Sequence, residues 1–238
     1  MSIFESTELA CPACGAINAF EAVHSVNADR RADLRRAILD GSFQRQPCVA
    51  CGNVFRLDTG FIYVELKKRH WIAARPVTGF DRWPEHEAEA RAIFDAAYGP
   101  EAPAAVRALA GETVPRLVFG WPALREKLIA AEAGLDDTVL ELVKMAMLRH
   151  LPETPFAADT TLRLIDVASD GTLVTAWVAN PDDATTAVKG VPREFYDAIA
   201  ADAADPQASP WGEALAAFTD ALFVDVDRLM IAGTPQAA

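Results

Sequence analysis

The sequence lacks the residue patterns by which most enzymes are recognised. Its 238 residues include only four histidines, and neither a Gly-x-Ser-x-Gly elbow nor a glycine-rich phosphate loop occurs. The histidines fall in different predicted elements: His24, His70, His86 and His150. The sequence therefore predicts no catalytic residue and no cofactor-binding residue. A site assembled from residues far apart in the chain stays open as an alternative.

Paired acidic residues are the remaining candidates for chemistry. Three pairs could act as general acids and bases or as ligands of a hard cation: Asp136 with Asp137, Asp182 with Asp183, and Asp225 with Asp227. Ordinary structure explains them more simply, as a helix cap, a turn and a solvated chain terminus. We assign no function to them.

Long apolar runs and a targeting segment are also missing. No run approaches the ~20 apolar residues that a spanning helix needs, and the first residues lack the basic and apolar regions of a signal peptide. The sequence therefore predicts a cytoplasmic protein without a membrane partner.

Positive charge is scarce, and the formal net charge is −12. Residues 1–75 carry ten Lys/Arg and eight Asp/Glu (+2), whereas the remainder carries twelve against twenty-six (−14). Because the acidic body repels phosphates, we expect no specific nucleic-acid partner. One cluster is basic: Arg30, Arg31, Arg35 and Arg36. It could contact phosphate or an acidic protein, but a solvated helix face with Asp29 and Asp33 as partners is the simpler interpretation.

Cysteine is rare, and its placement is the strongest signal in the sequence. The only four cysteines form two C-x2-C pairs, Cys11 with Cys14 and Cys48 with Cys51, and a glycine follows each pair. A two-residue spacer lets both sulfurs of one turn face one ion, and the glycine permits the left-handed backbone that closes the turn. The pattern predicts one structural zinc ion per chain, bound by all four cysteines, with no open position for catalysis.

Two other roles of four cysteines, disulfide bonds and a redox-active pair, need features that this sequence lacks. Two disulfides would need an oxidising compartment, and a thioredoxin-type redox pair would need a single C-x-x-C beside a βαβ unit. Four thiolates also suit iron, so the spacing favours zinc and leaves iron open.

Hydrophobic periodicity predicts an α+β protein with three regions. Residues 1–75 are expected to form an N-terminal zinc ribbon that carries a helical insertion between its cysteine pairs. Alternating residues indicate a strand over residues 20–26, and Leu34 and Ile38 mark the inner face of a helix over residues 30–39. Further strands are expected over residues 54–57, 61–66 and 70–73.

The other two regions follow from helix and hairpin signals. Residues 76–152 are expected to be helical and to include a helical hairpin, whose first helix runs from Pro122 to Ala133. Residues 153–238 are expected to form a C-terminal α+β region, with strands on either side of a turn at Asp170. Helices are expected there over residues 192–201 and 211–223.

Three segments together resemble the bacterial CpXC domain. They are Cys11-Pro12-Ala13-Cys14-Gly15, Leu39-Asp40-Gly41-Ser42-Phe43 and Cys48-Val49-Ala50-Cys51-Gly52-Asn53-Val54-Phe55. Val49 departs from the family pattern, which often has proline there, but that residue shapes the turn and ligates nothing. The stretch over residues 119–144 also resembles the region that follows in such proteins. The family has no assigned reaction, so the resemblance implies a fold and leaves the function open.

Binding of another protein is the function that these features favour. A closed metal site, an acidic body and the missing catalytic patterns favour a zinc-stabilised interaction or scaffold module without catalysis, whose protein partner is unidentified. The alternatives are a nucleic-acid-binding zinc ribbon that uses the basic cluster, and an enzyme with an unrecognised site.

Overall fold

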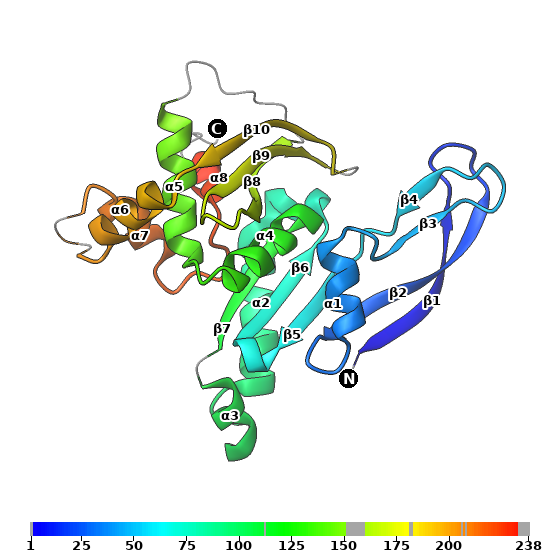
Figure 1. Ribbon diagram of the computed structural model, residues 1–238. Helices are drawn as coiled ribbons and strands as arrows, with labels where there is room; N and C mark the ends of the chain where they lie inside the picture. The colour runs from blue at the N-terminus through cyan, green and yellow to red at the C-terminus, as the bar shows by residue number, and fades with distance from the viewer. Residues whose placement is uncertain are drawn as a thin grey trace, which may run out of the picture. The chain divides into compact units, whose positions relative to one another are not determined.

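The computed structural model describes residues 2–111, 113–150, 160–180, 183–205, 207 and 209–232. The chain forms two compact units, Met1–Trp121 and Pro122–Ala238. Both contain helices and sheets, so the predicted α+β class is confirmed (Figure 1). The predicted three-region division stays a prediction: its boundary after residue 75 lies within the first unit, and its boundary after residue 152 lies outside the described residues.

A five-stranded sheet organises the first unit, in the order β1-β2-β5-β6-β7. Strand β2 is antiparallel to β1 and parallel to β5, and β6 is antiparallel to β5 and parallel to β7. The strands are β1 (Ile3–Ala10), β2 (Ile17–Asn27), β5 (Phe61–Glu65), β6 (His70–Arg75) and β7 (Val114–Phe119).

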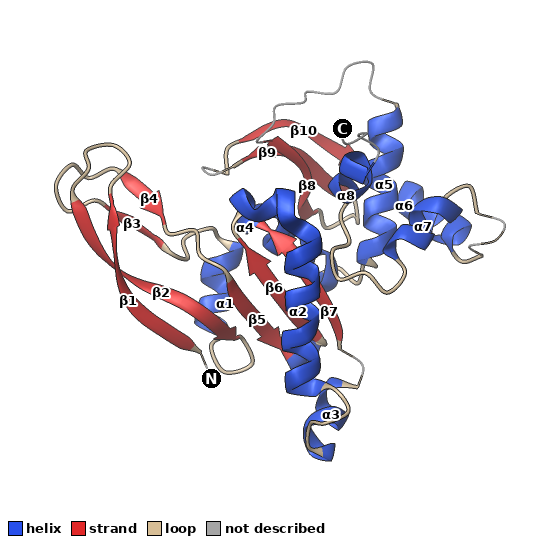
Figure 2. Cartoon of the chain, turned by 180° about the vertical axis from the view of Figure 1, so that it is seen from behind, coloured by secondary structure: helices blue, strands red, loops and turns tan. Residues whose placement is uncertain are grey.

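Helices cover both faces of this sheet. Helix α1 (Ala32–Leu39) lies against one face and α2 (Trp83–Tyr98) against the other, as the two opposite views in Figures 1 and 2 show. Leu34 and Ile38 are buried, as predicted for the inserted helix. The remaining helical segments are η1 (Leu66–Lys68), η2 (Val77–Arg82) and α3 (Ala104–Ala110).

A second hairpin, β3 (Arg45–Pro47) with β4 (Val54–Arg56), carries the second cysteine pair. The first pair lies in the turn between β1 and β2. Two hairpins that each present a cysteine pair are the expected ribbon-like start, and the inserted helix α1 lies between them in the sequence.

Strand β2 does not keep the predicted alternation along its whole length. Phe20 and Ala22 are buried, but Val23 is buried as well and His24 is exposed. A β-bulge opposite the start of β1 shifts the register here. Phe4 pairs with Val23 and Ile3 with Ser25, so His24 is the extra residue and the alternation is interrupted there.

The second unit contains a three-stranded antiparallel sheet, β10-β9-β8, with helices packed on it. The strands are β8 (Thr160–Val167), β9 (Leu173–Ala179) and β10 (Thr185–Val191). The helices are α4 (Gly120–Glu132), α5 (Asp137–Arg149), α6 (Arg193–Ala203), α7 (Gly212–Phe218) and α8 (Val226–Ala232). The predicted helical hairpin is present as α4 and α5, which are joined by a turn at Gly134.

The single helix predicted over residues 211–223 is wrong. Helix α7 ends at Phe218, Thr219 is extended and Asp220 has a positive φ of 57°. Two such residues cannot continue a right-handed helix. The apolar residues that follow, Leu222 and Phe223, are buried in a non-helical segment that leads into α8. Among the described residues, no helix combines the length and the apolar character needed to cross a membrane.

Candidate metal centre

The two cysteine loops are built on the same backbone hydrogen bonds. In the first loop, the N–H of Gly15 donates to the carbonyl of Cys11 at 2.9 Å, and the N–H of Cys11 donates to the carbonyl of Ala16 at 2.8 Å. In the second loop, Gly52 donates to Cys48 at 3.0 Å, and Cys48 donates to Asn53 at 2.8 Å. The glycines have positive φ angles of 75° and 72°, as the spacing predicted.

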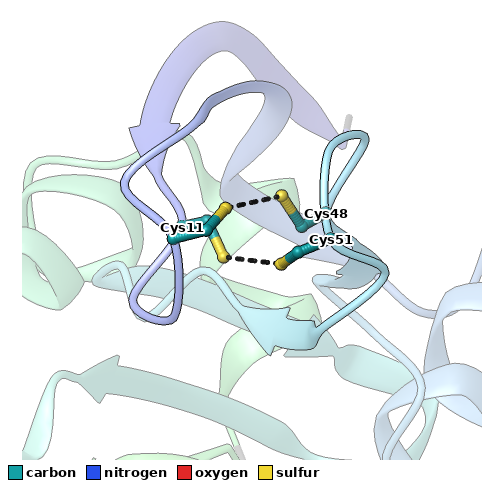
Figure 3. A group of neighbouring side chains, drawn as sticks. Cys11, Cys48 and Cys51 are labelled. Atoms are coloured by element: carbon teal, nitrogen blue, oxygen red, sulfur yellow. Dashed lines mark hydrogen bonds between the residues drawn. The ribbon is translucent and has the colours of Figure 1, made fainter.

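The structure brings all four predicted site residues together. Figure 3 shows Cys11, Cys48 and Cys51 with their sulfurs facing one another across the two loops. Their sulfur atoms lie within 4.8 Å of one another. Two distances between the loops are 3.7 Å: Cys11 Sγ to Cys51 Sγ and Cys14 Sγ to Cys48 Sγ. A tetrahedral ion with metal–sulfur bonds of about 2.3 Å places its sulfurs about 3.8 Å apart. The geometry fits one metal ion held by four cysteines, and it leaves the identity of the metal open.

The cysteines are free thiols at these distances, since a disulfide needs a sulfur–sulfur bond of about 2.05 Å. Cys11 and Cys48 are buried against the aromatic pair Phe20 and Phe55, whose ring centroids are 5.2 Å apart. Cys14 and Cys51 are exposed. The cluster is therefore half buried and rests on a small apolar core of its own.

The loop backbone distinguishes the thiols electrostatically. The N–H groups of Ala50 and Cys51 point at Cys48 and lower the pKa of its thiol to about 6. The pKa of Cys14 is raised to about 12: the N–H of Ala16 lowers it, but the neighbouring thiols, led by Cys51, outweigh that effect. Four thiols so close together cannot all ionise alone, whereas a divalent cation would stabilise all four thiolates.

One polar residue beside the four cysteines, Asn18, was not predicted from the sequence. Asn18 is 2% exposed, and its amide Nδ2 lies 3.6 Å from Cys48 Sγ and 2.8 Å from the carbonyl of Ala16. Its Oδ1 accepts the N–H of Val49 at 2.8 Å. A signal for it exists in the sequence, because Asn18 shares the buried face of β2 with Phe20 and is polar there.

A family model described as CpXC protein matches residues 9–144, more than half of the chain. The chain belongs to the CpXC family. The match includes all four cysteines and Asn18, and it ends within α5. Comparisons with curated proteins and with solved structures gave no match.

Two arginines of the basic cluster in this CpXC protein are engaged in ion pairs. Arg31 pairs with Asp33 at 2.6 Å, which confirms the predicted acidic partner. Arg35 pairs with Glu65 at 3.2 Å. The carboxylate of Asp29, the other predicted partner, instead accepts the backbone N–H of Leu66.

The three acidic pairs have different roles. Asp136 caps α5 by accepting the N–H groups of Thr138 and Val139, so the predicted cap is confirmed. Asp183 lies 2.9 Å from Arg125, and Asp182 lies outside the described residues. The solvated terminus predicted for Asp225 is wrong, because its side chain is 4% exposed and pairs with Arg163 at 2.5 Å.

Asp225 belongs to a set of charged side chains inside the second unit, which we call the buried ion network: Glu126, Lys127, Glu141, Lys144, Arg163 and Asp225. Lys144 lies 2.9 Å from Glu126 and 2.7 Å from Glu141. Arg163 lies 3.0 Å from Glu126. Within this buried set three acids face three bases, and every side chain is at most 5% exposed. The partly exposed Asp137 and Asp227 also pair with Lys127 and Arg163.

The buried ion network also forms hydrogen bonds with the backbone of the segment that leads into α8. Lys127 Nζ donates to the carbonyl of Val224 at 2.7 Å, and Glu141 Oε2 accepts the N–H of Val226 at 2.8 Å. The carboxylate oxygens of Glu126, Glu141 and Asp225 lie within 4.8 Å of one another. Lysine and arginine already neutralise them, so this cluster is a structural network rather than a second metal site.

Proposed function

We propose that this CpXC protein is a cytoplasmic, zinc-stabilised interaction module that binds another protein and has no catalytic site of its own. The sulfur geometry carries the proposal: four thiolates at tetrahedral spacing fill the coordination shell of zinc and leave no position for water or substrate. Such a site holds the surrounding hairpins in one shape. A rigid surface of this kind suits recognition.

Zinc is favoured over iron because two C-x2-C pairs that close around one tetrahedral ion are the usual ligand set of structural zinc. The proposed cytoplasmic location fits four free thiols this close together, because a reducing compartment would keep them from oxidising.

We expect no specific binding of DNA or RNA. Arg31 and Arg35 are engaged by Asp33 and Glu65, and the chain carries a net charge of −12. Sub-micromolar, salt-sensitive binding that disappears in Arg31→Glu/Arg35→Glu would instead support the nucleic-acid alternative.

The interaction role is tested by capture of native partners with the whole 238-residue chain. Deleting residues 1–75 would be a poor test, because it removes β6 and leaves β7 without its neighbour in the sheet. Cys51→Ser removes one metal ligand and leaves the second unit intact, and Arg193→Ala serves as a surface control in that unit. We expect Cys51→Ser to lose the proteins that the wild type and Arg193→Ala both capture. Equal capture by a metal-free Cys51→Ser protein would show that the ribbon is not the recognition element.

A further inference from the structure

Side-chain amides, rather than a backbone ladder, connect the two cysteine hairpins. Strand β2 pairs with β1 and β5, and β3 pairs with β4 only, within the described sheets. Gln44 donates from Nε2 to the carbonyl of Glu21 at 2.8 Å and accepts the N–H of Val23 at 3.2 Å. Gln46 donates to the carbonyl of Ala19 at 2.7 Å. Together with Asn18 these side chains form what we call the amide ladder.

Asn18 is the member of the ladder that reaches the cysteine cluster. Its Nδ2 contacts the carbonyl that closes the first loop and the sulfur of Cys48 in the second. Its Oδ1 accepts the N–H of Val49, the residue after Cys48. Only one orientation of the amide satisfies all three contacts, because the flipped amide would set Oδ1 against the Ala16 carbonyl and Nδ2 against the Val49 N–H.

We infer that Asn18 is a positioning residue that fixes the register of the two cysteine loops and holds the Cys48 sulfur toward the metal. An N–H donor to a ligand sulfur restricts its direction and stabilises the thiolate, which is how residues outside the ligand shell tune a metal site. Because Asn18 is buried, water does not compete for these contacts. This inference rests on the proposed metal function.

The two loops also supply an internal comparison. They share one backbone pattern, and Val49 follows Cys48 where Pro12 follows Cys11. A proline has no N–H, so the contact from Val49 to Asn18 exists only because this position departs from the Cys-Pro pattern of the first loop. Val49→Pro should fit the turn as Pro12 does, while removing that one contact.

The test compares metal binding by five proteins: wild type, Asn18→Asp, Asn18→Ala, Val49→Pro and Gln46→Ala. Asn18→Asp keeps the shape and the acceptor for Val49 but loses the donor to Cys48. Gln46→Ala is the matched control, since it loses an amide hydrogen bond to β2 but touches no sulfur. The measurements are the rate of zinc transfer to an excess of a chromogenic chelator, and the affinity and thiolate-to-cobalt absorption bands of the Co²⁺ form.

We expect both Asn18 variants to lose zinc about 10–100-fold faster than the wild type and to show shifted cobalt bands, the usual scale for a lost contact to a ligand. Gln46→Ala should keep the wild-type bands and rate, and Val49→Pro should change the rate less than Asn18→Asp.

Each contrary result has its own meaning. Unchanged zinc transfer and cobalt bands in a folded Asn18→Ala protein would overturn the positioning role and leave the proposed metal function standing. Equal changes of the zinc-transfer rate in Gln46→Ala and Asn18→Ala would also overturn it. The rate would then depend on the hydrogen bonds between the hairpins and not on the contact to the Cys48 sulfur. A wild-type protein that binds neither zinc nor cobalt would overturn the proposed metal function itself.

Discussion

At the scale of single residues, the candidate metal centre depends on two glycines that contribute a backbone conformation and no side chain. Gly15 and Gly52 close the two loops with positive φ angles, and a Cβ added at either would meet no atom within 4 Å. The requirement for glycine is therefore purely one of backbone conformation, because there is free space for a side chain.

Gly15→Ala and Gly52→Ala should each lower the free energy of unfolding of the metal-bound first unit by about 1–2 kcal/mol, the cost of a left-handed alanine. Gly111→Ala is the control, because that glycine follows α3 with an ordinary φ of −58°. Denaturant unfolding measures all three variants. A Gly15→Ala protein as stable as Gly111→Ala would contradict the conformational explanation.

Glu141 gives the second unit a pH dependence of stability. Burial raises its pKa from the usual 4.5 to about 7, with added repulsion from Asp225 and Glu126, although Lys144 and Lys127 oppose the shift. A raised pKa means that the folded state holds a proton that the unfolded state has lost. The contribution of Glu141 to stability is therefore full below pH 4.5 and falls as the pH rises to about 7.

Glu141→Gln should remove this contribution to the pH dependence while keeping an acceptor for Lys144 and Val226. We expect the stability of the wild type, relative to Glu141→Gln, to decrease between pH 4.5 and 7 by at most about 3 kcal/mol. Urea unfolding at a series of pH values measures it. A constant or increasing difference over that range would show that Glu141 is ionised throughout.

At the scale of elements, the buried ion network joins α4, α5, β8 and the start of α8 through charges rather than apolar contacts. Removing one partner of a buried pair leaves an uncompensated charge, which costs far more than losing a surface pair. Lys144 is the clearest case, because it is fully buried and pairs with two carboxylates.

Lys144→Met should destabilise the second unit by about 3–5 kcal/mol. Arg193→Met breaks the exposed pair with Asp197 and should cost at most about 1 kcal/mol. Thermal and urea unfolding of both variants give the comparison. Similar small effects in the two variants would mean that the network contributes no more than a surface ion pair.

The β3–β4 hairpin is the element that we expect to depend most on the proposed metal. Its strands have three residues each, and an isolated two-stranded hairpin is at best marginally stable. The amide ladder contributes about 1 kcal/mol per hydrogen bond, whereas zinc held by four thiolates contributes about 10–16 kcal/mol. The proposed metal would therefore set the stability of this hairpin, and Asn18 is the member of the amide ladder that we infer to fix its register.

Removal of metal by a chelator should greatly accelerate amide hydrogen exchange in residues 45–56. The β8–β9 hairpin is the internal control, since it lies in the second unit and contains no cysteine. Exchange followed by mass spectrometry of peptides compares the two. Equal protection of residues 45–56 with and without metal would show that the hairpin is stable without an ion.

At the scale of the whole molecule, the sequence was most informative where local chemistry determines local structure. The left-handed backbone of Gly15 and Gly52 and the helix cap at Asp136 each depend on a few neighbouring residues, so the sequence predicts them correctly. Strand β7 could not be predicted from the sequence, because three successive residues, Leu117, Val118 and Phe119, are all buried and show no alternation.

The features that sequence reasoning missed depend on tertiary contacts. Asp225 lies 62 residues from Arg163, and nothing near either residue in the chain indicates that they meet. Strand β1 has no fully buried residue and therefore no apolar stripe. Asn18 contacts Cys48 from 30 residues away, so its role becomes visible only when both hairpins are placed.

Metal stoichiometry tests the central claim most directly. Protein purified without chelators should carry one zinc ion per chain by native mass spectrometry and elemental analysis, and Cys14→Ser should carry markedly less. Iron in place of zinc would change the metal and keep the site. A folded wild-type protein with four free thiols and no bound metal would contradict the claim that these cysteines form a metal centre.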